Sequence, residues 1–139
     1  MPIITNIQAM IPCRLIYRSI ANDEILMPGQ LSKLANEASI YNRQLGLHGI
    51  LAVSDGKFLQ LLEGPSKFVN ELFCTIVKDP RHHQVELISF ENSVRPEFID
   101  WSMQLLDLDK VDASMLSFLM KKYPMKDNKF EFPNESFLM

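Results

Sequence analysis

The pattern of apolar and polar positions predicts a strand and then a helix in the first part of the chain. Residues 13–19 alternate between the two kinds of side chain and include types that favour strands. A loop through residues 22–24 follows. Residues 29–43 then place apolar or small side chains three and four positions apart, which is the spacing of one face of an α-helix. That face carries Leu31, Leu34, Ala35, Ala38 and Asn42.

The next segments predict a β-hairpin. Residues 47–53 and 57–63 are two apolar runs on either side of Ser54, Asp55 and Gly56. Asp-Gly is a preferred pair for the tight turn between two antiparallel strands, because both turn residues need a positive φ. The two runs are therefore expected to pair with each other.

The rest of the chain continues the alternation of helix and strand. A second helix is predicted over residues 67–78, a strand over 85–90, a short helical turn over 96–100 and a last strand over 101–106. The order is βαββαβ with an added fifth strand. This is the ferredoxin-like pattern of the α+β class, in which two helices share one face of a mixed sheet.

The opposite face of the sheet is also predicted to be apolar. Ile16, Leu59, Leu61 and Leu106 would point to it, away from the two main helices. Such a face needs a cover, and a helix predicted over residues 111–123 is the candidate within the chain.

Three polar side chains lie on faces that are otherwise apolar. Gln60 interrupts the apolar third strand, and Tyr17 of the first strand is expected beside it, because the first and third strands are neighbours in this fold. Asn42 lies on the apolar face of the first helix, near its end. On the same face Ala35 and Ala38 are small and leave space between the helices. A flat ligand could fill that space.

The chemistry of this polar cluster favours binding over catalysis. The cluster consists of a phenol and two neutral amides, without a carboxylate pair, a base or a nucleophile beside them. Each amide offers donor and acceptor groups, which suits the imide and carbonyl edge of a neutral heteroaromatic ring. The alternative is that Gln60 and Tyr17 only satisfy each other inside a core.

Composition and charge exclude several other classes of protein. A chain of 139 residues is long enough for one ordinary domain. Its 14 Lys and Arg and 17 Asp and Glu form no long run of one sign, so we expect no nucleic-acid partner. No apolar stretch reaches the roughly 18 residues of a membrane span, which favours a cytoplasmic location and no membrane partner. Cys13 and Cys74 are expected in the core rather than at a metal.

Several motifs resemble those of the BLUF family, flavin-binding domains that sense blue light. In the family's order, the matching segments are RLIYRS at 14–19, GLHGIL at 46–51 after Asn42, GKFLQLLEGP at 56–65, KDPRHH at 78–83 and FIDWSMQLLDL at 98–108. The chain is similar to the short stand-alone members. By this resemblance we expect an N-terminal extension over residues 1–12, a flavin-binding domain over 13–108, and a C-terminal helix and tail over 109–139.

The resemblance implies roles for the polar cluster and for the end of the domain. Tyr17 matches the family's photoactive tyrosine, Gln60 its switching glutamine and Asn42 the asparagine that hydrogen-bonds the carbonyl edge of the flavin. Light would draw an electron and then a proton from Tyr17, and recombination would leave Gln60 rotated or tautomerised. Trp101 and Met103 match a pair on the last strand that responds to the glutamine and passes the signal on.

Further contacts to the cofactor are expected from two residues outside this cluster. Tyr41 could pack on the flavin, and the planar guanidinium of Arg81 could meet a flavin phosphate. An exposed tyrosine and a solvated loop are the respective alternatives. No glycine-rich phosphate loop occurs, so an adenine tail would be held loosely. FAD is therefore the expected cofactor and FMN the alternative.

The resemblance implies a sensor rather than an enzyme. The signal would leave through the last strand and the C-terminal helix, toward other copies of the chain or a separate regulatory protein. Two rival classes remain. One is a small acylphosphatase-like enzyme, for which Arg14 and Arg18 flank the first strand without an anion-binding loop. The other is an interaction module without flavin, which, like the enzyme, would be colourless.

Overall fold

A five-stranded sheet is the frame of the molecule. The computed structural model describes residues 11–109. The strands lie in the order β4-β1-β3-β2-β5, and every neighbouring pair is antiparallel except β2 and β5. Their bounds are Pro12–Ala21 for β1, His48–Ser54 for β2, Lys57–Pro65 for β3, His82–Asn92 for β4 and Gln104–Asp107 for β5. This order confirms the predicted ferredoxin-like α+β fold with an added strand.

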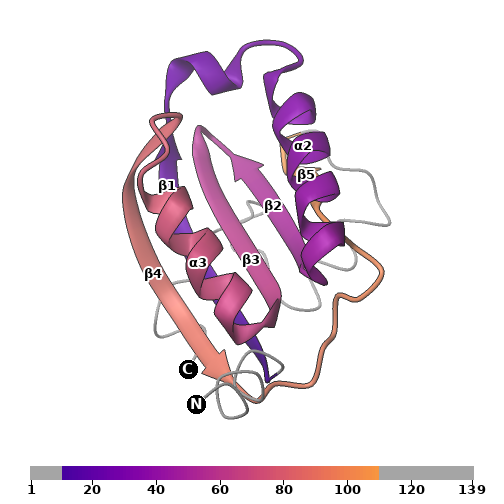
Figure 1. The fold of residues 1–139 in the computed structure, drawn as a ribbon. Helices are drawn as coiled ribbons and strands as arrows, with labels where there is room; N and C mark the ends of the chain where they lie inside the picture. The colour runs from indigo at the N-terminus through magenta and orange to yellow at the C-terminus, as the bar shows by residue number, and fades with distance from the viewer. Residues whose placement is uncertain (1–10, 110–139) are drawn as a thin grey trace.

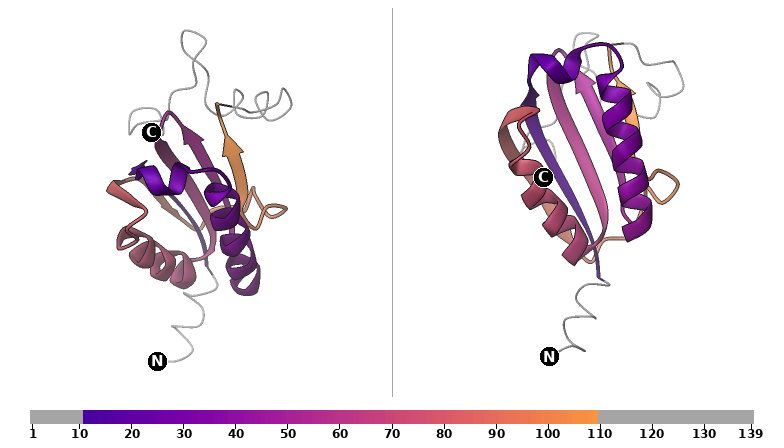
Figure 2. Two further views of the ribbon diagram at one scale, coloured as in Figure 1. Left: turned by 90° about the horizontal axis from the view of Figure 1, so that it is seen from above. Right: turned by 45° about the horizontal axis from the view of Figure 1, so that its top comes forward.

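Two helices lie on one face of this sheet (Figure 1). They are α2 (Gln30–Leu45) and α3 (Ser66–Val77), and both come within about a turn of the predicted bounds. The right-hand view of Figure 2 shows the same arrangement, with β3 and β2 visible between the helices. A short 3-10 helix, η1 (Asp23–Leu26), replaces the predicted loop, and its buried Ile25 packs into the core under the helices.

Left-handed backbone conformations flank α2 and form the turn between β2 and β3. Gly29 (φ 82°) precedes α2 and Gly46 (φ 69°) follows it. Both conformations cost glycine little, because it has no Cβ. Asp55 (φ 50°) and Gly56 (φ 72°) form the two-residue turn between β2 and β3, as the Asp-Gly pair predicted.

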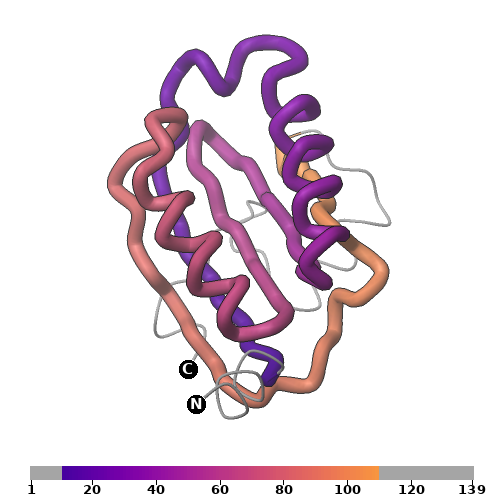
Figure 3. The backbone as a smooth tube through the Cα atoms, in the orientation of Figure 1, coloured from indigo at the N-terminus to yellow at the C-terminus, as the bar shows by residue number. Residues whose placement is uncertain are grey.

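The connection from β4 to β5 differs from the prediction. It runs around the end of the sheet to the side of α2 (Figure 3), with no helix at residues 96–100. A turn bond forms there, from the Trp101 N–H to the Phe98 carbonyl. The Trp101 carbonyl then accepts the Gly49 N–H of β2, which draws the chain toward the sheet edge. Regular pairing begins only at Gln104, so Trp101 and Met103 precede the last strand instead of lying on it.

Two apolar clusters lie on the two faces of the sheet. The front cluster, under the helices, includes Leu15, Tyr17, Leu51, Leu62 and Val69. The back cluster consists of Ile16, Ile50, Ala52, Leu59, Leu61, Phe98 and Leu106. The predicted orientation of Ile16, Leu59, Leu61 and Leu106 away from the helices is thereby confirmed. The helix predicted over residues 111–123 lies outside the described residues.

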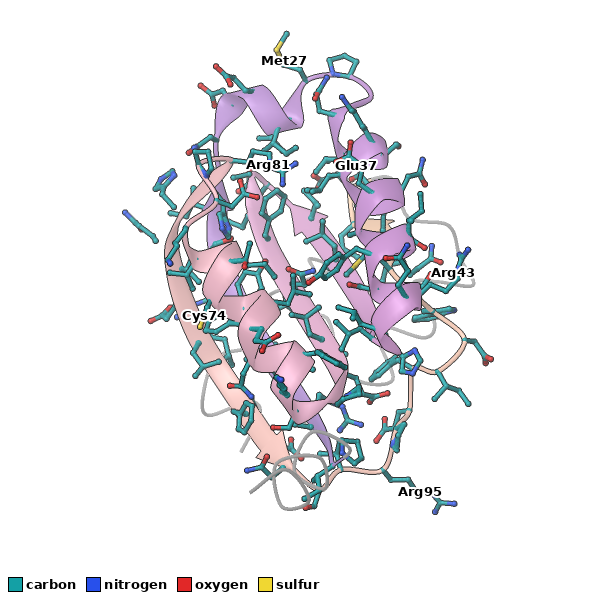
Figure 4. All side chains as sticks on the ribbon, viewed as in Figure 1. Met27, Glu37, Arg43, Cys74, Arg81 and Arg95 are labelled. Carbon is teal, nitrogen blue, oxygen red and sulfur yellow. The ribbon has the colours of Figure 1, made fainter. Side chains whose placement is uncertain are left out.

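The two cysteines differ in burial. Cys13 is buried in the front cluster, as expected, and burial raises the pKa of its thiol. Cys74 is exposed on α3 (Figure 4), so its predicted place in the core is wrong. The reason is the helical period, because Phe73 and Ile76 of α3 pack on the core and turn Cys74 outward.

Candidate functional site

A cavity of about 320 Å³ lies between α2, α3 and the sheet, in the range of small-molecule sites. Its apolar walls include Leu34, Ala35, Ala38, Leu51, Phe58, Leu72 and Ile76. Its polar lining includes Tyr17, Glu37, Tyr41, Asn42, Thr75, Gln60, Asp79, Arg81 and His82. The fold thus brings the predicted polar cluster and the two small alanines together at one hollow.

Tyr17 and Gln60 form the floor of the cavity. They are direct partners in the β1–β3 ladder, and both are buried. The Tyr17 hydroxyl donates a hydrogen bond to Gln60 Oε1, so the predicted contact is confirmed. Burial raises the pKa of the Tyr17 phenol well above its ordinary value, and the nearby Asp79 carboxylate raises it further. The phenol therefore stays protonated at neutral pH.

Met103 is the second partner of Gln60. Gln60 Nε2 points at Met103 Sδ, 3.8 Å away, and Met103 is buried in the front cluster. Trp101 lies on the other face, where its ring packs 6.1 Å from that of Phe98. The two residues predicted to act as a pair are therefore divided between the two faces of the sheet.

Asn42 places an unsatisfied acceptor in the site. Its side chain is 1% exposed, and Nδ2 donates to the Ser102 carbonyl at 2.7 Å. Asn42 Oδ1 is buried and has no hydrogen-bond partner within residues 11–109. A buried acceptor without a donor costs about 1–3 kcal/mol. This atom therefore fits a ligand that carries an N–H group.

The wall that α2 contributes to the cavity carries small side chains, and one of its residues is partly exposed to solvent. Ala35 and Ala38 both line the cavity, as predicted, and their small side chains leave it wide. Tyr41 also lines it and is 47% exposed, so its ring stands at the opening. A flat ring against Ala35 and Ala38 could contact Tyr41 at its rim.

Charged groups stand at one end of the cavity. Arg81 donates to Asp79 from Nε at 3.0 Å and from Nη2 at 2.6 Å. This hydrogen bonding lowers the pKa of the Asp79 carboxyl and raises that of Arg81. Glu37 of α2 adds a second carboxylate, and Figure 4 shows it at the same end of the molecule as Arg81. A phosphate here would have to compete with Asp79 for the guanidinium.

His82 is a site residue that the sequence reasoning missed. Its Nδ1 lies 2.7 Å from Ser19 Oγ and its Nε2 lies 2.7 Å from the Ile76 carbonyl. The ring centroid is 6.0 Å from that of Tyr17, in an edge-on arrangement. Because the carbonyl can only accept, Nε2 carries a proton. The segment KDPRHH contains the signal for this residue, as part of a basic cluster expected at a flavin phosphate and not as a partner of the Tyr17 side of the cavity.

The arginines that flank β1 are engaged elsewhere. Arg14 pairs with the buried Glu63, and Arg18 pairs with Glu86. Because both guanidinium groups are paired with carboxylates within residues 11–109, neither is available to hold an anion, which disfavours an acylphosphatase-like site. Within residues 11–109, no group of three or more His, Cys, Asp and Glu side chains could hold a metal ion.

Comparison with known proteins agrees with this geometry. Residues 13–104 match the sequence profile of BLUF, "Sensors of blue-light using FAD". The chain belongs to the BLUF family. BLUF domains bind a flavin, and the cavity with its unsatisfied Asn42 acceptor fits such a group.

Relatives of this BLUF chain include parts of larger proteins. It is 32% identical over 99 residues to the photoactivated adenylate cyclase subunit beta of Euglena gracilis, covering 70% of the chain and 12% of the relative. It is 34% identical over 95 residues to the blue light- and temperature-regulated antirepressor BluF of Escherichia coli, covering 68% of the chain and 23% of the relative. The chain thus spans less than a quarter of the length of either relative.

A solved structure of similar size shows the same BLUF fold. BlrB, described as a BLUF protein in its dark state, superposes with a TM-score of 0.67 at 27% identity. The match covers 84% of this chain and 81% of BlrB. Within residues 11–109, no helix of the BLUF chain has both the length and the apolar character needed to cross a membrane.

Proposed function

We propose that residues 13–108 form a flavin-binding light sensor in which Tyr17 and Gln60 are the photoactive pair. The hydrogen bond between these two residues, at a cavity also lined by Asn42 with its unsatisfied Oδ1, is the observation that carries the proposal. A bound flavin supplies absorption of blue light and an excited state that accepts an electron. Asn42, Tyr17 and Gln60 would hold it and respond to it.

Asn42 is proposed to hold the imide edge of the ring. Its Nδ2 is already occupied by the Ser102 carbonyl, which leaves Oδ1 to accept an imide N–H. Ala35 and Ala38 supply the flat apolar wall. FAD is the cofactor of the family. FMN is the alternative because Arg81, the one arginine at the cavity within residues 11–109, is already paired with Asp79. Arg81 reaches a phosphate only by giving up part of that pairing.

Tyr17 is proposed to donate an electron and then its phenolic proton. Its raised pKa means that the ground-state phenol does not lose the proton at neutral pH. Once the Tyr17 ring has lost an electron, it holds its phenolic proton only weakly. Gln60 Oε1 already accepts a hydrogen bond from the Tyr17 hydroxyl and is therefore the nearest acceptor for that proton. Return of the electron and proton restores the phenol.

Gln60 is proposed to be the switch, because its two neighbours prefer different ends of its side-chain amide. Tyr17 donates to its carbonyl oxygen, and its amide faces the Met103 sulfur, which can only accept. Rotation of the amide would place oxygen against sulfur and a donor against the phenol. A buried network with few good arrangements has two states rather than a continuum.

The domain is proposed to sense and not to catalyse. Its cavity holds neutral amides and a protonated phenol, and relatives carry the same kind of domain within longer proteins. The signal would pass to a separate regulatory protein or to other copies of the chain. The cytoplasmic location expected from the sequence stays a prediction.

An absorption spectrum of the purified protein, before and after blue light, tests the proposal. We expect a yellow protein whose flavin band shifts reversibly to the red, and release of free flavin on denaturation. A colourless protein, whose denatured supernatant lacks flavin fluorescence after expression with ample flavin, would instead support the interaction module. A yellow protein without a light-induced shift would contradict the photoactive pair.

A further inference from the structure

We propose that Glu63, with Arg14, is a positioning residue for the photoreaction, because its buried carboxylate holds the loop that carries Met103 to Gln60. This inference rests on the proposed function. Neither residue lines the cavity. Glu63 is three positions after Gln60 on β3 and so points to the opposite face of the sheet, where Arg14 is its direct partner on β1.

The carboxylate of Glu63 divides its two oxygens between two tasks. Oε1 accepts the backbone N–H groups of Glu97 and Phe98, both at 3.0 Å. Oε2 accepts Arg14 Nε at 3.1 Å and Nη2 at 2.7 Å, and it also lies 3.1 Å from the Glu97 nitrogen. The Glu63 side chain is 0% exposed. A buried charge persists only where such partners surround it, so this arrangement tolerates little displacement.

Arg14 holds the same loop at further points. Its Nη2 donates to the Arg95 carbonyl at 3.0 Å. Its guanidinium carbon lies 5.7 Å from the centre of the Phe98 ring, within the range of a cation–π contact. The ion pair therefore grips the β4–β5 connection on both backbone and side chain.

A short chain of backbone contacts leads from this grip to the cavity. The Phe98 carbonyl accepts the Trp101 N–H at 3.0 Å, and the Trp101 carbonyl accepts the Gly49 N–H at 2.9 Å. Met103 follows two residues later and meets Gln60 on the front face. Glu63 thus fixes the loop on the sheet face opposite the helices, and Gln60 contacts the end of the loop, at Met103, on the face under the helices.

The inference predicts a kinetic effect. If Glu63 no longer holds the loop, Met103 Sδ moves away from the Gln60 amide. The dark state then loses the contact between Gln60 Nε2 and Met103 Sδ, which the lit state, with its rotated amide, does not make. The Gln60 amide turns back toward Met103 during thermal return, so the transition state already makes part of this contact. Without the contact, return to the dark state should slow by about three- to tenfold, the value of roughly one hydrogen bond in a rate constant.

Two double variants separate the effect of the hydrogen bonds between Glu63 and the amides of residues 97 and 98 from the effect of the Arg14–Glu63 ion pair. Arg14→Leu with Glu63→Gln removes the pair but keeps a carbonyl oxygen where Oε1 accepts the two loop amides. Arg14→Leu with Glu63→Leu removes the pair and that acceptor. We expect the second to return about three- to tenfold more slowly than the first after a light pulse. Glu86→Gln on β4 is the control and should match the parent protein, because it removes an exposed ion pair with Arg18 of β1 and leaves Glu63 untouched.

Equal return rates in the two double variants would overturn the inference. If the Glu63→Leu double variant does not fold with flavin, Glu63→Asp replaces it, because the shorter side chain keeps the charge but withdraws the carboxylate from the loop. A Glu63→Asp protein with the parent's return rate would also overturn the inference. A parent protein that binds flavin but shows no red shift would overturn the proposed function itself. In that case, amide hydrogen exchange at residues 97, 98 and 101 tests separately whether Glu63 holds the β4–β5 connection. Exchange should be faster in the double variant with Glu63→Leu, which lacks the acceptor oxygen, than in the one with Glu63→Gln.

Discussion

Gly49 of β2 lies so close to Met103 that a Cβ on the glycine would come within 2.9 Å of Met103 Cε. The same Cβ would lie 2.8 Å from the Leu61 carbonyl oxygen, which belongs to backbone and cannot turn away. The position of the Met103 thioether beside Gln60 thus depends on the absence of a side chain at Gly49 of β2. A side chain at position 49 would therefore have to displace either Met103 or the backbone of β3.

Gly49→Ala should displace Met103 or spread β2 from β3. We expect a loss of about 1–3 kcal/mol in the free energy of unfolding, as for other overpacked cores, and a changed light-induced shift. Chemical denaturation and difference spectroscopy measure the two effects. Ser54→Ala, at the far end of the same strand, is the matched control. An unchanged shift in Gly49→Ala would show that the sulfur's position does not matter.

Tyr17→Phe and Gln60→Leu should keep the flavin and abolish its reversible red shift. Each removes one partner of the hydrogen bond between β1 and β3 while nearly preserving side-chain volume. Flavin content after denaturation and the light-minus-dark spectrum are the measurements. A full shift in Gln60→Leu would refute the assignment of the switch.

Asn42→Ala should weaken flavin retention, because it removes an unsatisfied buried acceptor from a residue that lines the cavity. A loss of one buried hydrogen bond is worth about 1 kcal/mol, so we expect roughly fivefold weaker binding. Titration of the apoprotein with flavin gives the dissociation constants. Asn36→Ala, on the exposed side of α2, should bind as the parent does. Equal affinities for the two variants would remove Asn42 from the site.

Stability should fall with rising pH above about 10, the ordinary pKa of tyrosine. Burial raises the pKa of Tyr17 in the folded state, so the unfolded chain loses this proton first. The unfolded state then binds fewer protons, and the free energy of unfolding declines by up to about 1.4 kcal/mol per pH unit. Denaturation at pH 9 to 11 should show this slope in the parent and a smaller one in Tyr17→Phe. Identical slopes would mean that Tyr17 is not the titrating group.

Light should change amide protection near the end of the domain. Met103 connects Gln60 to the loop before β5, and the helix predicted over residues 111–123 follows that strand. Hydrogen exchange in dark and lit samples should differ over residues 101–123. Unchanged protection there, in a sample whose flavin band has shifted, would mean that the signal leaves by another route.

The sequence by itself determined the order of elements and the central polar pair. Alternation and helical spacing depend only on which face of a local element is buried, so the strands and both main helices were predictable to within a few residues. Adjacent first and third strands follow from that order. Tyr17 and Gln60 were thus expected in contact before any coordinate was known, and Asn42 was expected on the same face.

Only the tertiary structure decided how the β4–β5 connection runs. No local pattern shows that Glu63, more than thirty residues away, accepts the amides of residues 97 and 98, or that Gly49 binds the Trp101 carbonyl. These distant hydrogen bonds replaced the predicted helical turn and sent Trp101 and Met103 to opposite faces. The free oxygen of Asn42 was equally hidden, because a sequence names the polar side chain but not the atoms that are left without a partner.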